Sequence, residues 1–279
     1  MMEKKRAAVL FGGCSSEYEV SLQSAYGVIN HIDRKRYEVV LIGLHQKTGQ
    51  WFWFDGHPDL IAQDLWYEKG ICTPVYVPTD KRVRGLHYLK DGALRTLSLD
   101  LVLPILHGKN GEDGTVQGAL ELAGIRTVGC DLLSSALCMD KELAHRVAAG
   151  AGVRVPKSVL IRKPYENLNV WKDGERLGYP LFVKPVRAGS SFGITMVQTE
   201  EELIPALERA FEHDSKVIME EQIEGREVGC AILGTEELLV GEADEIELSE
   251  GFFDYTEKYT LKTSSIHVPA RVAPETAGQ

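Results

Sequence analysis

The feature that most constrains the fold is a short apolar run near the start of the chain that ends in two glycines. Residues 7–11 read Ala-Ala-Val-Leu-Phe and are followed by Gly12 and Gly13. A continuous apolar run of this length predicts a strand that is buried on both faces of a parallel sheet. From Glu19 onward apolar residues recur at helical spacing, and residues 37–45 predict a second strand. This order predicts a doubly wound α/β domain that binds its ligand at the carboxyl ends of the strands.

The alternation of predicted strands and helices is interrupted at residues 46–98 and then continues to about the middle of the chain. Residues 46–98 carry aromatic residues and several turn signals, which predict irregular hairpins. Residues 99–106 then predict another buried strand, which is followed by a polar glycine loop and a helix that Gly124 would cap. A further helix is expected to end near Gly150. Beyond it, strand signals follow one another closely around one helix at about 200–212, which predicts an antiparallel α+β arrangement.

Composition excludes several classes of protein. The chain has 279 residues, 44% of them hydrophobic, which suits about two soluble domains. Its net charge is -10 and it has no basic run, which argues against nucleic acid as a partner. The five cysteines are never spaced as C-x-x-C, so neither a disulfide framework nor a zinc site is indicated. Because no apolar stretch approaches the length of a signal or membrane segment, we predict a cytoplasmic protein without membrane contact.

Two glycine-rich turns in the first half are candidate binding sites. In the turn 12–17, Glu17 can hold a substrate ammonium beside helix amides, although it can equally favour the helix dipole at an ordinary tight turn. In the loop 107–114, His107 leaves a buried strand at the place where α/β folds bind ligands, so it can donate to a developing carboxylate or phosphate charge. A solvated loop with a satisfied histidine is the alternative.

Three further candidates lie in the second half. Lys184 stands on a predicted strand before the Gly/Ser loop 187–193, and a lysine with loop amides can clamp a polyphosphate. The loop matches neither a Walker motif nor a dinucleotide fingerprint, and it can also be an ordinary hairpin. Residues 216–233 join two strands through an acidic linker that can accept hydrogen bonds from adenine and ribose, or can simply be a solvated hairpin. Residues 251–262 interleave aromatic and charged side chains, which favours a loop that closes over a ligand.

These elements, taken in order, resemble the D-alanine:D-alanine ligase family of the ATP-grasp class, from about residue 6 to the end of the chain. The matching motifs are FGGCSSEYEVS, LHGKNGEDGTVQG, SALCMDK, FVKPVRAGSSFGI, VIMEEQIEGREVGCAIL and FDYTEKY. Within the family, the stretches GCDLLSSALCMDK, EVGC and DEIELSEGFFDYTEKYTLK are similar to the VanG-type vancomycin-resistance ligases, which make D-alanyl-D-serine. The resemblance implies an α/β substrate-binding domain at 1–129, a central ATP-grasp subdomain with its connecting helix at 130–224, and the start of a C-terminal ATP-grasp subdomain at 225–279.

By this resemblance the protein is a ligase that uses ATP and magnesium in peptidoglycan precursor synthesis, and it forms a homodimer. ATP phosphorylates the carboxylate of one D-alanine, and the amine of a second D-amino acid attacks the acylphosphate. Glu17 would bind the ammonium of the first substrate and form a hydrogen-bonded trio with Ser190 and Tyr259. His107 would stabilise the substrate carboxylate or acylphosphate, and Lys258 would meet the transferred phosphoryl group.

The resemblance assigns five residues to ATP. Lys141 and Lys184 would neutralise its phosphates, and Ser191 with the neighbouring amides would cover them. Glu220 and Glu227 would bind adenine and ribose. These roles are physically reasonable because phosphoryl transfer to a carboxylate brings anions together and needs cations to offset their repulsion.

The chain departs from the family pattern after residue 272. Family members continue with an Arg-x-Asp strand motif and a carboxylate/asparagine motif that supply the oxyanion arginine and the magnesium ligands. Because neither motif follows here, we expect the last ATP-grasp domain to be truncated, assign no metal ligand within the chain, and expect negligible ligase activity from these 279 residues alone. Tyr259 favours an amine over D-lactate as second substrate. An ATP-grasp ligase for another carboxylate and amine, or a nucleotide-binding module without activity, are the alternatives.

Overall fold

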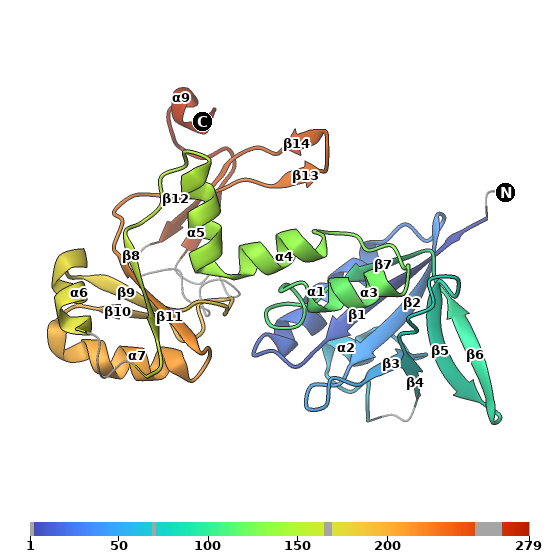
Figure 1. Cartoon of the computed structure of the whole chain (residues 1–279). Coiled ribbons are helices and arrows are strands. Elements are labelled where there is room, and N and C mark those ends of the chain that lie inside the picture. The colour runs from blue at the N-terminus through green and yellow to red at the C-terminus, as the bar shows by residue number, and fades with distance from the viewer. Residues whose placement is uncertain (1–2, 69–70, 165–168, 249–263, 279) are drawn as a thin grey trace.

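The computed structural model describes residues 3–68, 71–164, 169–248 and 264–278. The described chain forms two large sheets, a three-stranded sheet and a hairpin (Figure 1). The first sheet has the order β6-β5-β4-β3-β2-β1-β7. Its strands are β1 (Lys5–Gly12), β2 (Tyr37–Leu44), β3 (Trp51–Phe54), β4 (Cys72–Tyr76), β5 (Gly85–Lys90), β6 (Ala93–Ser98) and β7 (Leu101–Pro104).

The first sheet is mixed: the predicted parallel arrangement is confirmed for β1, β2 and β7, whereas the sheet as a whole is not parallel. Only β1 pairs in parallel, with β2 on one side and β7 on the other. The hairpin region at 46–98 instead adds β3 to β6 as antiparallel strands beyond β2. A parallel pair needs a crossover of a dozen or more residues, whereas short turns reverse the chain and give antiparallel neighbours.

The two faces of β1 are covered by different helices. Ala8 and Leu10 belong to the core cluster that includes helix α3 (Thr115–Leu122), whereas Val9 and Phe11 belong to the cluster that includes helix α1 (Tyr18–His31). Successive side chains on a strand point to opposite faces, so a strand covered on both sides must be apolar throughout. The predicted two-sided burial of residues 7–11 is therefore confirmed.

A buried tryptophan fixes the packing on the α1 face of this sheet. Trp66 has no exposed surface, and its ring lies 5.1 Å from that of Phe11 in an edge arrangement. Gly43 of β2 lies directly against this ring, because a Cβ atom at position 43 would stand 2.4 Å from Trp66 Cζ3. The short helix α2 (Asp59–Ala62) leads into the segment that carries Trp66.

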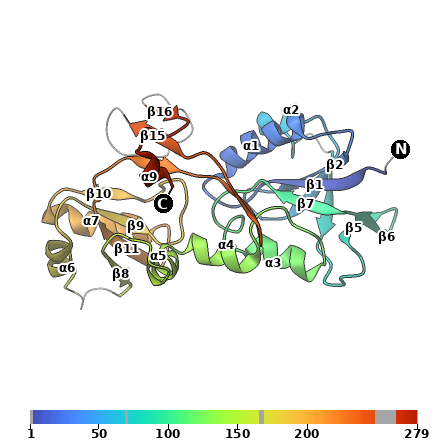
Figure 2. The same cartoon turned by 90° about the horizontal axis from the view of Figure 1, so that it is seen from above.

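Two helices lead from the first sheet to the second. Helices α4 (Leu132–Met139) and α5 (Lys141–Gly150) are separated by Asp140, where a single helix was predicted. Asp140 has extended backbone and its side chain accepts a hydrogen bond from the Leu143 amide, so it ends one helix and caps the next. Both views place α4 between α3 and α5 (Figures 1 and 2).

The second large sheet is antiparallel, as predicted, with the order β10-β9-β11-β8. It consists of β8 (Ser158–Arg162), β9 (Leu181–Pro185), β10 (Thr195–Val197) and β11 (Lys216–Glu221). Helices α6 (Val170–Leu177) and α7 (Leu203–Phe211), the latter preceded by a 3-10 turn at Glu200–Glu202, contribute to the core on one face. The opposite face carries the even-numbered residues of β9 and β11, which include the candidate residues Lys184 and Glu220.

The last described strands form two small groups. Strands β12 (Glu227–Gly229), β15 (Asp244–Leu248) and β16 (Ser264–His267) make the three-stranded sheet, and β13 (Ile232–Gly234) pairs with β14 (Leu238–Val240). A short helix, α9 (Pro274–Ala277), follows. Within the described ranges, no helix is both long enough and apolar enough to cross a membrane.

Two glycine substitutions test the packing around Trp66. We expect Gly43→Ala to lower the free energy of unfolding by about 1–3 kcal/mol, because the added methyl group collides with a rigid, fully buried ring. Gly27→Ala, inside α1 with nothing within 4 Å of the new Cβ, should instead raise it by about 0.5–1 kcal/mol. Urea unfolding of both variants measures the difference. Equal effects of the two substitutions would contradict this packing.

Candidate active site

The site is organised around the carboxylate of Glu17, which lies at the N-terminus of α1 and is only 3% exposed. A Cβ atom at Gly108 would stand 1.9 Å from Glu17 Oε2, and one at Gly189 would stand 2.9 Å from Oε1. Two glycine loops from different sheets therefore close on one carboxylate. Ser190, in the second loop, donates a hydrogen bond to Glu17 Oε1 across a sequence separation of 173 residues.

His107, which precedes Gly108, is held by two serines. Ser15 Oγ donates to the His107 carbonyl at 2.7 Å, and Ser24 Oγ of α1 lies 3.1 Å from His107 Nε2. The loop that follows is also fixed, since the Gly108 amide donates to Glu112 Oε2 at 2.7 Å. Glu17, Ser190 and the loop that begins at His107 therefore lie together, and the functional roles of these residues stay predictions. The two supporting serines were missed, although Ser15 lies in the motif that suggested the site.

The Gly/Ser loop between β9 and β10 adopts an uncommon backbone conformation. Ser190 and Ser191 have φ angles of 45° and 62°, in the left-handed region that side chains with a Cβ rarely adopt. Consecutive residues of this kind are typical of ligand-binding loops, where the surrounding structure holds the strain. The loop is anchored where it begins, because Asp214 accepts hydrogen bonds from the Arg187 amide at 2.7 Å and guanidinium at 2.6 Å. Burial by itself would raise the pKa of Asp214, but these bonds outweigh it and hold the pKa below its usual value.

Lys141 joins helix α5 to the same loop. Its Nζ donates to the Ala188 carbonyl at 2.7 Å, and its amide donates to the Val186 carbonyl at 3.2 Å. The preceding Asp140 is 4% exposed and binds Lys216 Nζ at 3.0 Å. This pairing locks the start of α5 onto β11. The Lys141 ammonium consequently lies beside the loop that carries Ser190 and Ser191.

Lys184 and Glu220 form an ion pair on the face of the second sheet that lies opposite α6 and α7. Glu220 is 2% exposed, and its Oε2 accepts a hydrogen bond from Lys184 Nζ. The Lys184 ammonium also stands 5.2 Å from the ring centroid of Phe182, its neighbour on the same face of β9. Phe182 is directly opposite Glu220 in the pairing of β9 with β11. A cation, a carboxylate and an aromatic surface are therefore adjacent, an arrangement that suits a nucleotide.

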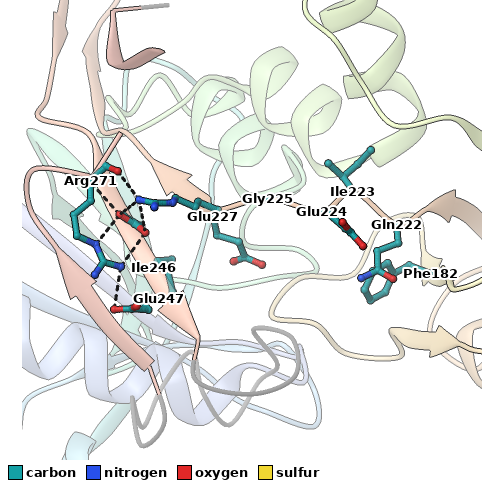
Figure 3. Close-up of a pocket in the computed structure, with 11 residues that line it drawn as sticks. Phe182, Gln222, Ile223, Glu224, Gly225, Glu227, Ile246, Glu247 and Arg271 are labelled. Carbon is teal, nitrogen blue, oxygen red and sulfur yellow. Dashed lines mark hydrogen bonds and ion pairs between the residues drawn. The ribbon is translucent and has the colours of Figure 1, made fainter. Parts of the chain in front are cut away.

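A cavity of about 690 Å³ opens next to Phe182 (Figure 3). Figure 3 shows Phe182 and Gln222 at one end, Glu227 in the middle, and Glu247 with Arg271 at the other end. Its far wall contains an ionic cluster that the sequence did not predict, because its members come from three separate segments. Glu245 accepts hydrogen bonds from Arg271 at 3.0 and 3.1 Å, and these bonds lower the pKa of Glu245 to about 2. Arg226 completes the cluster, with Nη1 3.5 Å from Glu245.

The remaining candidate residues are Glu227, Lys258 and Tyr259. Glu227 lines the same cavity as Phe182, and its role in nucleotide binding stays a prediction. Lys258 and Tyr259 lie outside the described residues. Among the residues that the structure describes there is no group of three or more His, Cys, Asp or Glu side chains suited to a metal ion.

Comparison with known proteins identifies the family. Residues 6–130 match the family described as "D-ala D-ala ligase N-terminus", and residues 147–279 match "D-ala D-ala ligase C-terminus". The chain belongs to the D-alanine:D-alanine ligase family. The resemblance inferred from the six motifs is confirmed.

Individual members of the ligase family show how far the similarity extends. A D-alanine--D-alanine ligase of Thermoanaerobacter sp. (strain X514) is 45% identical over 260 residues, which are 92% of this chain and 72% of that ligase. A putative D-alanine--D-lactate ligase of Streptomyces coelicolor is 46% identical over 253 residues, covering 90% of this chain and 70% of that protein. The structure of the VanG D-Ala:D-Ser ligase from Enterococcus faecalis has a TM-score of 0.87 and 52% identity, and the match covers 99% of this chain and 79% of that one.

The fit of Glu17 between the two loops can be tested with a matched pair of glycine substitutions. Gly108→Ala and Gly92→Ala both place a Cβ on a residue of positive φ, 69° and 73°, which costs about 1–2 kcal/mol in each case. Only the residue at 108 meets another group, Glu17 Oε2, whereas the surroundings of Gly92 are open. We expect Gly108→Ala to destabilise the protein by an additional ~1–3 kcal/mol in urea unfolding. Equal losses would show that Glu17 is not confined by this loop.

Proposed function

We propose that this protein is an ATP-dependent ligase that joins D-alanine to a second D-amino acid, D-alanine or D-serine, through an acylphosphate, for peptidoglycan precursor synthesis. Its family and the names of its relatives support this reaction class. The observation that carries the proposal is the buried Glu17 carboxylate, bound by Ser190 and enclosed by Gly108 and Gly189. An ionised carboxylate is rarely buried unless a cation or hydrogen-bond donors meet it. The ammonium of D-alanine is such a cation.

On the substrate side, each described residue has a definite task. Glu17 binds the ammonium of the first D-alanine and thereby aims its carboxylate toward the Gly/Ser loop. His107, fixed by Ser15 and Ser24, offers its imidazole to the charge that develops on the carboxylate and acylphosphate. Because both serines hold the histidine before substrate arrives, no reorganisation is needed during the reaction.

On the nucleotide side, the cations offset the repulsion between phosphate and carboxylate. Lys141 and Lys184 neutralise the phosphates of ATP, and the amides next to Ser191 cover them. Glu220 and Glu227 bind the base and the ribose. Magnesium would neutralise further charge on the phosphate oxygens, and because the described residues do not provide a cluster of ligands for it, we assign no step to it. The proposal includes Lys258 at the transferred phosphoryl group and Tyr259 as the third member of the trio with Glu17 and Ser190.

The second substrate is proposed from Tyr259 rather than from overall similarity. Relatives of comparable identity are named for D-alanine, D-lactate and D-serine, so overall similarity does not choose among these acceptors. Tyr259 in the sequence Glu-Lys-Tyr favours an amine nucleophile. A pocket that binds the hydroxyl of D-serine can distinguish it strongly from D-alanine. A homodimer is also part of the proposal.

A coupled phosphate-release assay tests the reaction and the role of Glu17. It is carried out with D-alanine as the first substrate and with D-alanine, D-serine or D-lactate as the second. We expect D-alanine-dependent phosphate release with D-alanine or D-serine as acceptor, and no depsipeptide with D-lactate. Glu17→Gln should lower the rate roughly 10- to 100-fold, because the ammonium loses a charged partner.

The matched control is Glu19→Gln, which changes an exposed carboxylate in the same turn of α1 and should leave the rate unchanged. Equal rates for the Glu17 and Glu19 variants would contradict the proposed ammonium site. Preferential use of D-lactate would show that the interpretation of Tyr259 is wrong.

A further inference from the structure

Glu220 lies between two nitrogen-bearing side chains, of which only one has a role in the proposed function. Lys184 binds its Oε2, and on the other side the Nδ1 atom of His145 stands 3.7 Å from its Oε1. Both Oε1 and His145 Nδ1 are buried, and neither has a hydrogen-bond partner in the described part of the chain. Two buried polar atoms of complementary type therefore face each other across a gap slightly longer than a hydrogen bond.

From this geometry we infer that His145 is a positioning residue for Glu220. A movement of less than about 1 Å brings Nδ1 to hydrogen-bond distance of Oε1. The terminal torsion of a glutamate is broad, so a carboxylate held through one oxygen can turn about its axis. Held by Lys184 at one oxygen and by His145 at the other, the carboxylate of Glu220 has a fixed plane. This inference rests on the proposed binding of the adenine base by Glu220.

An imidazole suits this position better than a permanent cation. Lys184 already balances the charge of Glu220, and a neutral imidazole adds a donor without adding a second positive charge to the buried pair. The nearest charged groups on the same helix are engaged with each other, since Arg146 Nη2 lies 2.5 Å from Glu142 Oε1. Both line a cavity of about 260 Å³ together with His145. The imidazole is therefore the group on α5 that is directed at Glu220.

A fixed plane of the Glu220 carboxylate favours adenine over a base that carries an oxygen in place of the amino group. A carboxylate can only accept hydrogen bonds, so it attracts the exocyclic amino group of adenine and repels an oxygen in the same place. This discrimination depends on a lone pair that points steadily at the base. His145 thus contributes to the preference for ATP over inosine triphosphate, which carries an oxygen where ATP carries the amino group, without itself touching the nucleotide.

Calorimetric titration of the 279-residue chain with ATP and with inosine triphosphate tests the inference. We expect the unsubstituted chain to prefer ATP, and His145→Leu to reduce that preference about tenfold, mainly through weaker binding of ATP. His145→Asn, whose side-chain amide nitrogen occupies the place of Nδ1, should retain most of the preference. Arg146→Gln, at the next position of the same helix and 73% exposed, should leave it unchanged.

A double-substitution cycle shows whether His145 acts through Glu220. In a Glu220→Gln background, His145→Leu should cause no further loss of base preference. An unchanged preference in His145→Leu, or an equal loss in both backgrounds, overturns the inference. If the unsubstituted chain binds neither nucleotide, the proposed ATP site itself fails, and the inference fails with it. Melting temperatures of all variants identify any loss that comes from unfolding.

Discussion

The arrangement of the site depends on how one buried carboxylate is enclosed. Glu17 belongs to the first sheet domain, and the hydroxyl that binds it belongs to the second. The contact forms only because the residues on either side, Gly108 and Gly189, lack a Cβ atom. A buried carboxylate needs hydrogen-bond donors or a cation as partners. The hydrogen bond from Ser190 therefore connects the two domains, and the same carboxylate can bind an ammonium.

In the second domain, buried carboxylates are paired with basic side chains, although the chain as a whole carries a net charge of -10. Three buried carboxylates, those of Asp140, Asp214 and Glu220, each bind a lysine or an arginine. The acids hold the cations in place before an anion arrives, so binding of phosphate requires little side-chain ordering. A positive site can in this way be built within an acidic protein. Composition alone argued against nucleic acid as a partner but could not reveal such a site.

The sequence was sufficient to predict features that depend only on residues close together in the chain. The apolar run at 7–11 and the capping glycine at position 124, whose φ is 66°, depend on neighbours in the chain and were predicted. The direction of the strands at 46–98 depends on which sheet edge they join, and turn residues do not specify that edge. The Glu245 cluster and the pairing of His145 with Glu220 join segments far apart in sequence, so no spacing rule could find them. The family resemblance did predict the hydrogen bond of Ser190 to Glu17, because it carries three-dimensional information that periodicity lacks.

The substrate side and the nucleotide side of the site meet in the Gly/Ser loop that carries Ser190 and Ser191. Ser190 binds Glu17 through its side chain, while the backbone around Ser190 and Ser191 is held in a left-handed conformation next to Lys141. Ser190 thus links the carboxylate that would bind an ammonium to the amides that would cover phosphate. Since binding energies are reciprocal, an ammonium at Glu17 and a nucleotide on the second sheet must favour each other if each stabilises the same conformation of this loop. Such coupling suits a reaction in which the phosphoryl group must be transferred only when an amino acid is in place.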